Sequence, residues 1–128
     1  MTDLAALLNS SGLLVAEEAA QALNDGWRLT DFAPANVADL TRIYSARAEH
    51  LATKAGPHAQ QLRASTKEFV ANLRDATGAT LGFIQGPAEH QYVIAMSESP
   101  SRVIGCLKIV SKLDVSERRW EELWSSAV

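Results

Sequence analysis

The side chains that most often carry acid–base, nucleophilic and metal chemistry are few here: three histidines, His50, His58 and His90, and one cysteine, Cys106. His50 and His58 are eight positions apart with Gly56-Pro57 between them, so no regular helix can hold both on one face. Neither has a Cys, Asp or His at a recognised metal-ligand spacing, and no HExxH motif occurs. The histidines therefore predict no metal site.

Cys106 is the only cysteine, so we expect no internal disulfide, and a single thiol is typical of a reducing compartment. It lies in the apolar run Val103 to Val110 (VIGCLKIV), which predicts a buried, inert thiol. The opposite interpretation is an enzyme whose pocket is lined by Cys106 or His90 with a perturbed pKa. Because no GxSxG, SxxK, GxxxxGKS/T or GxGxxG motif is present, the sequence predicts neither a catalytic residue nor a cofactor.

The first 27 residues carry four acidic side chains and no Lys or Arg, in a chain of net charge −3: Asp3, Glu17, Glu18 and Asp25. They lack the basic start and apolar core of a signal peptide, and no stretch approaches the ~20 apolar residues that span a bilayer. The acidic balance disfavours nucleic acid and anionic membranes as partners. We therefore expect a cytoplasmic protein, with Glu17, Glu18 and Asp25 on a solvated helix face or on a surface for a basic partner.

Two short helices are expected within residues 2–24, interrupted by Asn9-Ser10-Ser11-Gly12 and stopped by Asn24-Asp25-Gly26. Trp27 to Phe32 fits either a short strand or an extended linker.

A helical hairpin follows, and it is the clearest predicted element. Pro34 suits the first turn of its first helix, and Asn36 with Asp39 resembles a capping pair. The apolar face of this helix is Val37, Leu40, Tyr44, Ala48 and Leu51, and that of the second is Leu62, Thr66, Phe69, Leu73 and Ala76. Six basic residues are interleaved with acidic ones, a pattern typical of a solvated face: Arg42, Arg47, Lys54, Arg63, Lys67 and Arg74.

From Thr80 the hydrophobic period changes to that of strands, and the turn spacing predicts a three-stranded antiparallel meander to about residue 110. Val103 to Val110 is apolar on both faces and reads as a central strand, in which Gly105 marks a bulge or a close backbone approach. Gly82 and Gly86 are expected to flank a turn. A closing helix is expected over about 115–126.

Trp120 and Trp124 share one face of that closing helix. They either complete the core or form an exposed aromatic patch at a partner site. The predicted architecture is one α+β domain over residues 1–128: a helical layer (about 2–77) packed on a small three-stranded sheet (about 80–110), plus the C-terminal helix.

Two stretches resemble part of the GNAT-type N-acetyltransferases. Tyr92 to Val110 (YVIAMSES–PSRVIGCLKIV) is similar to the second and third strands of that family, and Trp27 to Tyr44 (WRLTDFAPANVADLTRIY) to its first strand and first helix. The family holds the acyl-CoA pyrophosphate on a Q/R-x-x-G-x-G/A loop after its fourth strand. No glycine follows Gly105 here, so the resemblance implies at most a reduced relative without the cofactor loop.

Three classes of function follow. The favoured one is a small binding module that docks on another protein, as bacterial immunity proteins, inhibitors, antitoxins and secretion chaperones do, through Glu17, Glu18 and Asp25 or through Trp120 and Trp124. The second is a small enzyme, specifically a reduced GNAT-like acyltransferase. The third is an assembly protein that forms homo-oligomers through the helical hairpin.

Overall fold

The computed structural model describes residues 3–54, 56–74, 76, 78–86, 90–98 and 101–110. Its elements are α1 (Leu4–Ser10), α2 (Ala16–Asn24), β1 (Arg28–Leu29), β2 (Ala33–Ala35), α3 (Val37–Ala52), α4 (Pro57–Leu73), β3 (Ala79–Gln85), β4 (His90–Glu98) and β5 (Ser101–Val110). The α+β class is confirmed. The predicted closing helix over about 115–126, with Trp120 and Trp124, lies outside the described residues.

The two N-terminal helices and the hairpin form where the periodicity places them. Asp3 caps α1 by accepting a hydrogen bond from the Ala5 N–H, and Gly26 follows α2 with a φ of 92° that glycine adopts without strain. Asn36 caps α3 by accepting from the Asp39 N–H. Pro57 stands at the first position of α4, where its missing N–H costs nothing.

The sheet is antiparallel throughout, with the order β1-β3-β4-β5 and with β2 also paired to β3. The meander β3–β4–β5 is confirmed, but the prediction of only three strands is wrong. The segment after Trp27 supplies two short strands that pair with the outer edge of β3 (Arg28 opposite Gln85, and Ala33 opposite Leu81). Pro34 therefore lies in β2 rather than in a helix, a place that suits proline because an edge strand can do without one N–H donor.

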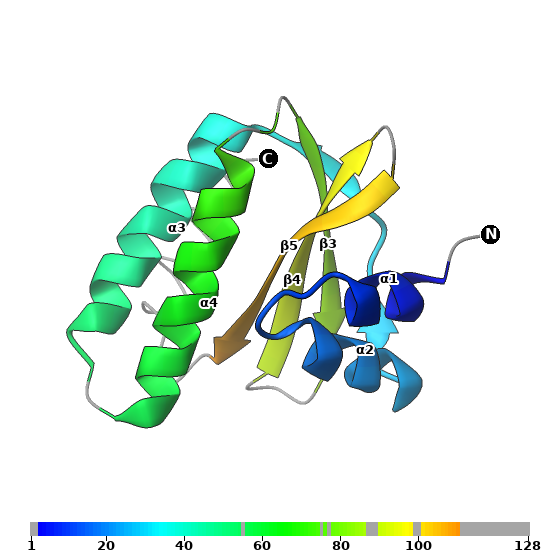
Figure 1. Cartoon of the computed structure of the whole chain (residues 1–128), viewed down its shortest axis with the longest axis horizontal. Coiled ribbons are helices and arrows are strands. Elements are labelled where there is room, and N and C mark those ends of the chain that lie inside the picture. The colour runs from blue at the N-terminus through cyan, green and yellow to red at the C-terminus, as the bar shows by residue number, and fades with distance from the viewer. Residues whose placement is uncertain are drawn as a thin grey trace.

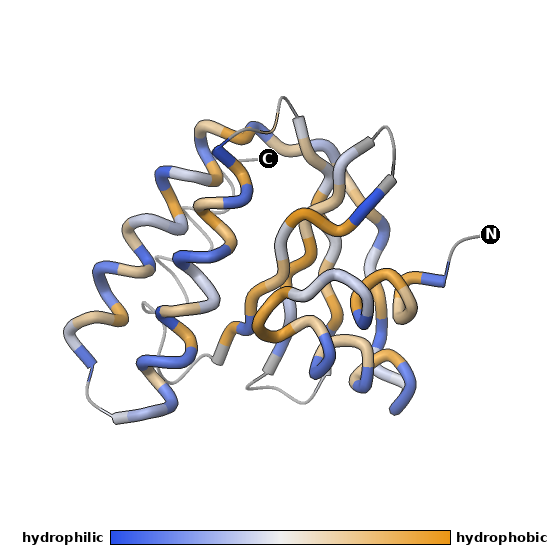
Figure 2. Tube along the Cα trace, in the orientation of Figure 1, coloured by the Kyte–Doolittle hydropathy of each residue, from blue (hydrophilic) through white to orange (hydrophobic). Residues whose placement is uncertain are grey.

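Helices cover both faces of this sheet, which corrects the single helical layer predicted above. The hairpin α3–α4 lies on one side and the short pair α1–α2 on the other (Figure 1). The tube in Figure 2 is most apolar along the strands and on the helix turns that face them. The hairpin side buries Leu40, Ile43, Tyr44, Phe69, Val70, Leu73, Ala79, Leu81, Val93, Ala95, Ile104, Leu107 and Ile109; the α1–α2 side buries Ala5, Leu8, Val15, Ala16, Ala19, Ala20, Ala22, Ile84, Tyr92, Ile94 and Cys106.

The two layers explain why VIGCLKIV is apolar in both alternating sets. We predicted a central strand there, but among the described strands β5 is last in the sheet order, whereas β3 and β4 each have a neighbour on both sides. Along β5, Leu107 faces the hairpin while Cys106 faces α1 and α2. An end strand covered on both faces has the same composition as a central one, so composition could not distinguish the two.

Gly105 lies at a β-bulge and against an aromatic ring, as its position in the strand suggested. Ala95 pairs with Gly105 while Met96 pairs with Val103, so Ile104 is the extra residue. A Cβ at Gly105 would meet the Phe69 ring at 2.7 Å. Gly82 does not flank a turn, because it lies within β3, where its missing Cβ leaves room for the Phe32 ring. Gly86 directly follows β3, and its missing Cβ leaves room for the Trp27 ring.

One basic residue of the hairpin is buried, against the prediction of a solvated face. Arg47 is 1% exposed, because the buried face of α3 runs through Ile43 and Arg47 rather than through Ala48. Its guanidinium donates to the Thr66 Oγ1 on α4 and, at 2.7 Å, to the Lys108 carbonyl on β5. Arg47 thus links both helices of the hairpin to the last strand of the sheet.

None of the helices in the described residues is both long enough and apolar enough to cross a bilayer.

Candidate functional site

A cluster of three polar side chains lies where α2 meets the sheet: Glu18, Tyr92 and Lys108. Tyr92 and Lys108 are opposite each other on β4 and β5, and both point to the α2 side. The Tyr92 hydroxyl donates to Glu18 Oε2 at 2.7 Å, and Lys108 Nζ lies 3.2 Å from the same oxygen. The Trp27 ring lies next to the Tyr92 ring, with the two ring centroids 5.8 Å apart.

The electrostatics of this cluster favour one protonation state. Burial is the largest influence on the Glu18 carboxyl and raises its pKa, but the hydrogen bonds from Tyr92 and Lys108 and the charges of Lys108 and His58 together outweigh it. The pKa of Glu18 is therefore lowered from its usual value. The pKa of Tyr92 is raised, first by burial and then by its bond to Glu18. At neutral pH an ionised carboxylate is held by a neutral hydroxyl and an ammonium group.

These bonds join α2 to the sheet through Glu18, whose side chain remains 44% exposed. Glu18→Gln should lower the free energy of unfolding at pH 7 by less than about 1 kcal/mol, because the site is partly exposed. A carboxylate whose pKa falls on folding stabilises the fold above its unfolded-state pKa and loses that contribution as pH falls through the folded-state pKa. The variant should therefore lose less stability than the wild type between about pH 5 and pH 3.

Urea unfolding at several pH values in that window measures the effect. Glu17→Gln is the matched control, because Glu17 is the adjacent residue on α2 and its exposed side chain has no hydrogen bond to any described residue. If the free energy of unfolding of both variants depended on pH in the same way, the bonds of Glu18 to Tyr92 and Lys108 would not contribute to stability.

The candidates for acid–base, nucleophilic and metal chemistry lie on four different elements: α3, α4, β4 and β5. Cys106 is fully buried, as predicted, and burial raises the pKa of its thiol, so it stays protonated at neutral pH. His50 is in the last turn of α3 and His58 in the first turn of α4. In the part of the chain that the structure describes, no three His, Cys, Asp or Glu side chains form a group that could hold a metal ion. His90 begins β4.

The predicted acidic residues separate into two kinds. Glu17, Glu18 and Asp25 are all exposed, but only Glu18 bonds to the sheet; Glu17 and Asp25 form one ridge along α2 with Gln21, since the three are spaced four residues apart. Gln21 Nε2 donates to Asp25 Oδ1 at 2.9 Å. The Glu18 carboxylate, between them in sequence, instead accepts hydrogen bonds from Tyr92 and Lys108 of the sheet. Sequence composition identified this acidic segment but could not separate its members.

Leu14 extends this ridge at its N-terminal end, and sequence reasoning did not single it out. Its side chain is 60% exposed, the highest value among the large apolar residues described. Its backbone N–H donates to Glu68 Oε1 on α4 at 3.0 Å, so the loop that presents it is attached to the hairpin. We call Leu14, Glu17, Gln21 and Asp25 the acidic ridge.

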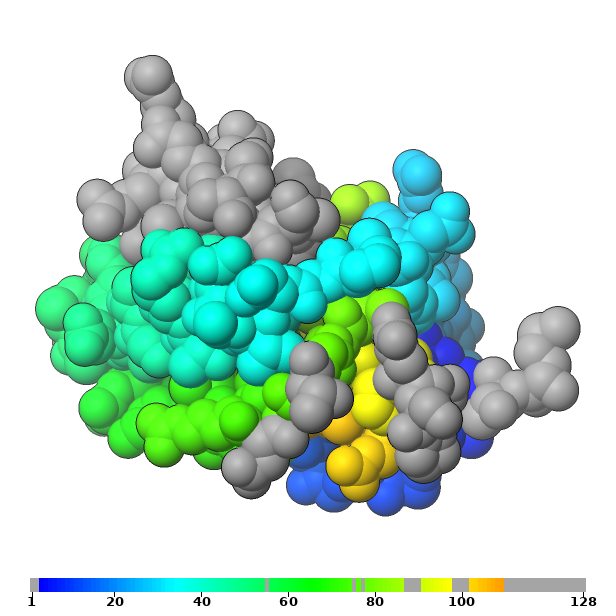
Figure 3. Space-filling view, turned by 90° about the horizontal axis from the view of Figure 1, so that it is seen from above, coloured from blue at the N-terminus to red at the C-terminus, as the bar shows by residue number. Residues whose placement is uncertain are grey.

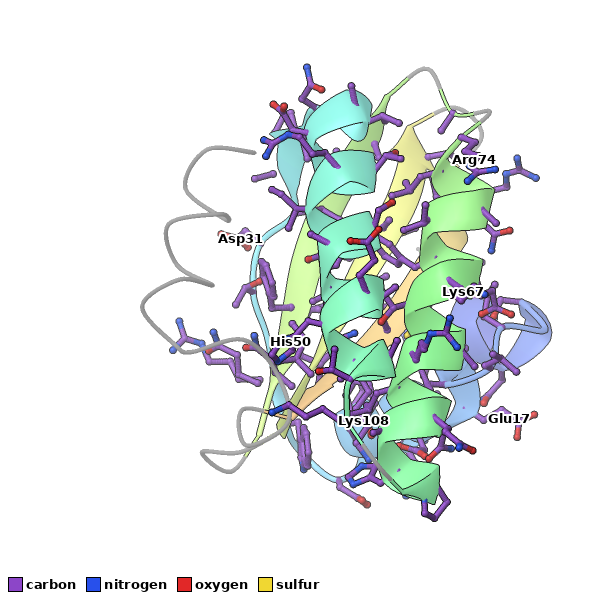
Figure 4. All side chains as sticks on the ribbon, turned by 90° about the vertical axis from the view of Figure 1, so that its left-hand side faces the viewer. Glu17, Asp31, His50, Lys67, Arg74 and Lys108 are labelled. Carbon is purple, nitrogen blue, oxygen red and sulfur yellow. The ribbon has the colours of Figure 1, made fainter. Side chains whose placement is uncertain are left out.

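A second surface feature is a groove on the outside of the hairpin, with a volume of about 460 Å³. We call it the hairpin groove; it is lined by Ser45, Ala48, Glu49, Ala52, Arg63, Lys67, Val70, Ala71 and Arg74. The two helices lie side by side in the space-filling view of Figure 3, and Figure 4 shows Lys67 and Arg74 projecting from α4. Glu17 lies beyond α4 in the same view, on the side away from α3.

Comparison with known proteins assigns no family to this chain. No family model matches the sequence, and neither a curated protein nor a solved structure is significantly similar to it.

Proposed function

We propose that this protein is a binding module that docks the acidic ridge onto a basic partner protein, in the manner of a cytoplasmic inhibitor or immunity protein. The observation that carries the proposal is Leu14: a large apolar side chain held out in water on a loop tied to α4. An exposed apolar anchor with a charged rim is typical of protein interfaces. Trp120 and Trp124 are a further candidate surface within the same proposal.

The charge of the ridge defines the chemistry of the partner. Glu17 is in the first turn of α2, Asp25 follows its last turn, and Glu68 accepts a hydrogen bond from the Leu14 backbone, so the ridge is acidic at both ends. Acidic rims of this kind speed association with a basic surface and make binding depend on salt. We therefore expect a partner with an apolar pocket edged by Lys or Arg.

The test is affinity capture from the source-cell lysate at low and moderate salt, followed by quantitative binding of the captured protein to variants. Leu14→Ala should weaken binding by about thirtyfold if Leu14 is the anchor. Glu17→Lys should slow association by about tenfold at low salt, and less at high salt. Asp31→Lys is the matched control, because it makes the same charge change at an exposed position between β1 and β2.

Equal binding by Leu14→Ala and wild type would contradict the proposal for this surface. If no partner is captured at either salt, the acyltransferase alternative becomes the one to examine, by thermal unfolding with acetyl-CoA at millimolar concentration.

A further inference from the structure

The hairpin groove has a charge opposite to that of the acidic ridge. Arg63, Lys67 and Arg74 are exposed and follow one line along α4, together with Val70, in steps of four, three and four residues. At 1.5 Å per residue, this line is roughly 16 Å long. The ion pairs found in the described residues, Arg42–Asp39 and Lys108–Glu18, lie elsewhere, so these three cations are unpaired there.

The floor and far wall of the groove restrict what can fill it. Ala48, Ala52 and Ala71 are small, so an apolar side chain can come close to both helix backbones. Glu49 on the α3 wall places one carboxylate opposite the line of cations. An occupant should therefore be acidic on the edge that faces the cations of α4 and apolar at its centre. Its other edge should tolerate the carboxylate of Glu49.

We infer that the hairpin groove binds an acidic amphipathic helix of a partner protein. A helix fits because it can lay small or medium apolar side chains, spaced three and four residues apart, between two existing helices while its carboxylates meet the cations. Nucleic acid fits less well: the chain is acidic, Glu49 repels phosphate, and no aromatic side chain lines the groove on which a base could stack.

This inference is independent of the proposed function, since the groove and the acidic ridge use different residues. The probe is a fluorescein-labelled synthetic helix with Glu on one face and Ala and Leu on the other, measured by fluorescence anisotropy at low salt. A scrambled peptide of the same composition tests whether the helical pattern matters.

The variant pair Arg63→Glu with Lys67→Glu should weaken binding of the peptide by at least about tenfold. The pair Arg28→Glu with Arg102→Glu, which makes the same charge change at exposed positions on β1 and β5, should change it by less than about twofold. Ala71→Phe fills the floor without altering charge and should also weaken binding about tenfold. Glu17→Lys should leave it no weaker.

The inference would be overturned by an equal loss in both charge-reversed pairs, because net charge would then explain the binding. It would also be overturned if the scrambled peptide bound as tightly as the patterned one, if a single-stranded oligonucleotide of equal charge bound more tightly, or if no peptide bound at all. Thermal unfolding of each variant verifies that the fold is intact, which is expected because these positions are at the surface.

Discussion

Arg47→Ala should lower the free energy of unfolding by about 3–4 kcal/mol, a large part of what holds a domain of this size together. The substitution empties the space of a long side chain that is 1% exposed. It also removes the donors that reach the Thr66 hydroxyl and the Lys108 carbonyl. Because those groups belong to α4 and β5, the loss loosens the hairpin from the sheet.

Chemical unfolding followed by circular dichroism measures this effect. Arg63→Ala is the control, because it removes the same side chain from an exposed position on α4 and should change stability by less than about 0.5 kcal/mol. Arg47→Met should fall between the two, since it keeps most of the volume but leaves the two acceptors without these donors. An Arg47→Ala cost as small as that of Arg63→Ala would show that burial of this guanidinium contributes nothing net.

Gly105→Ala should lower the free energy of unfolding by about 1–3 kcal/mol, because the added methyl group overlaps the Phe69 ring. The ring has little room to retreat, since Phe69 is fully buried and packs edge-on against Tyr44 with ring centroids 4.9 Å apart. The bulge at Ile104 further constrains this part of β5.

Gly78→Ala is the matched control for this substitution. Gly78 has open space where a Cβ would stand and does not have a positive φ, so alanine there should be neutral or slightly stabilising. Adding Phe69→Leu to Gly105→Ala should cost less than the sum of the two single changes, since the smaller side chain relieves the overlap. Additive costs would place the strain of Gly105→Ala away from the ring.

The helices and strands that follow from local hydrophobic periodicity were predicted well. The two N-terminal helices, the hairpin and the β3–β5 meander all form where periodicity and turn residues indicate. Periodicity succeeds because each element's own spacing decides which of its sides can be buried. The prediction was wrong for one residue of α3. Arg47 shares the buried face of Leu40, Tyr44 and Leu51, but its charge suggested a solvent-exposed position.

The candidate surfaces show a similar division. The acidic character of α2 could be read directly, as could the alternation of charges on the hairpin. The bonds of Glu18 to the sheet depend on Tyr92 and Lys108, which are 74 and 90 residues away along the chain. The exposure of Leu14 likewise follows from where its loop lies on α4, which no local pattern encodes.

By itself, then, the sequence determined the α+β class, the approximate positions of the helices within residues 2–77, the β-meander, a buried thiol and an acidic N-terminal segment. Only the tertiary structure decided that helices cover both faces of the sheet, that β1 and β2 extend it, that β5 is the last of the described strands, and that Arg47 is interior. The physical reason is that the apolar face of a helix or strand must be buried, but the residues of that face do not specify which other element buries it. Packing partners and sheet neighbours are chosen between segments far apart in sequence, and the surfaces left over are the candidate binding sites.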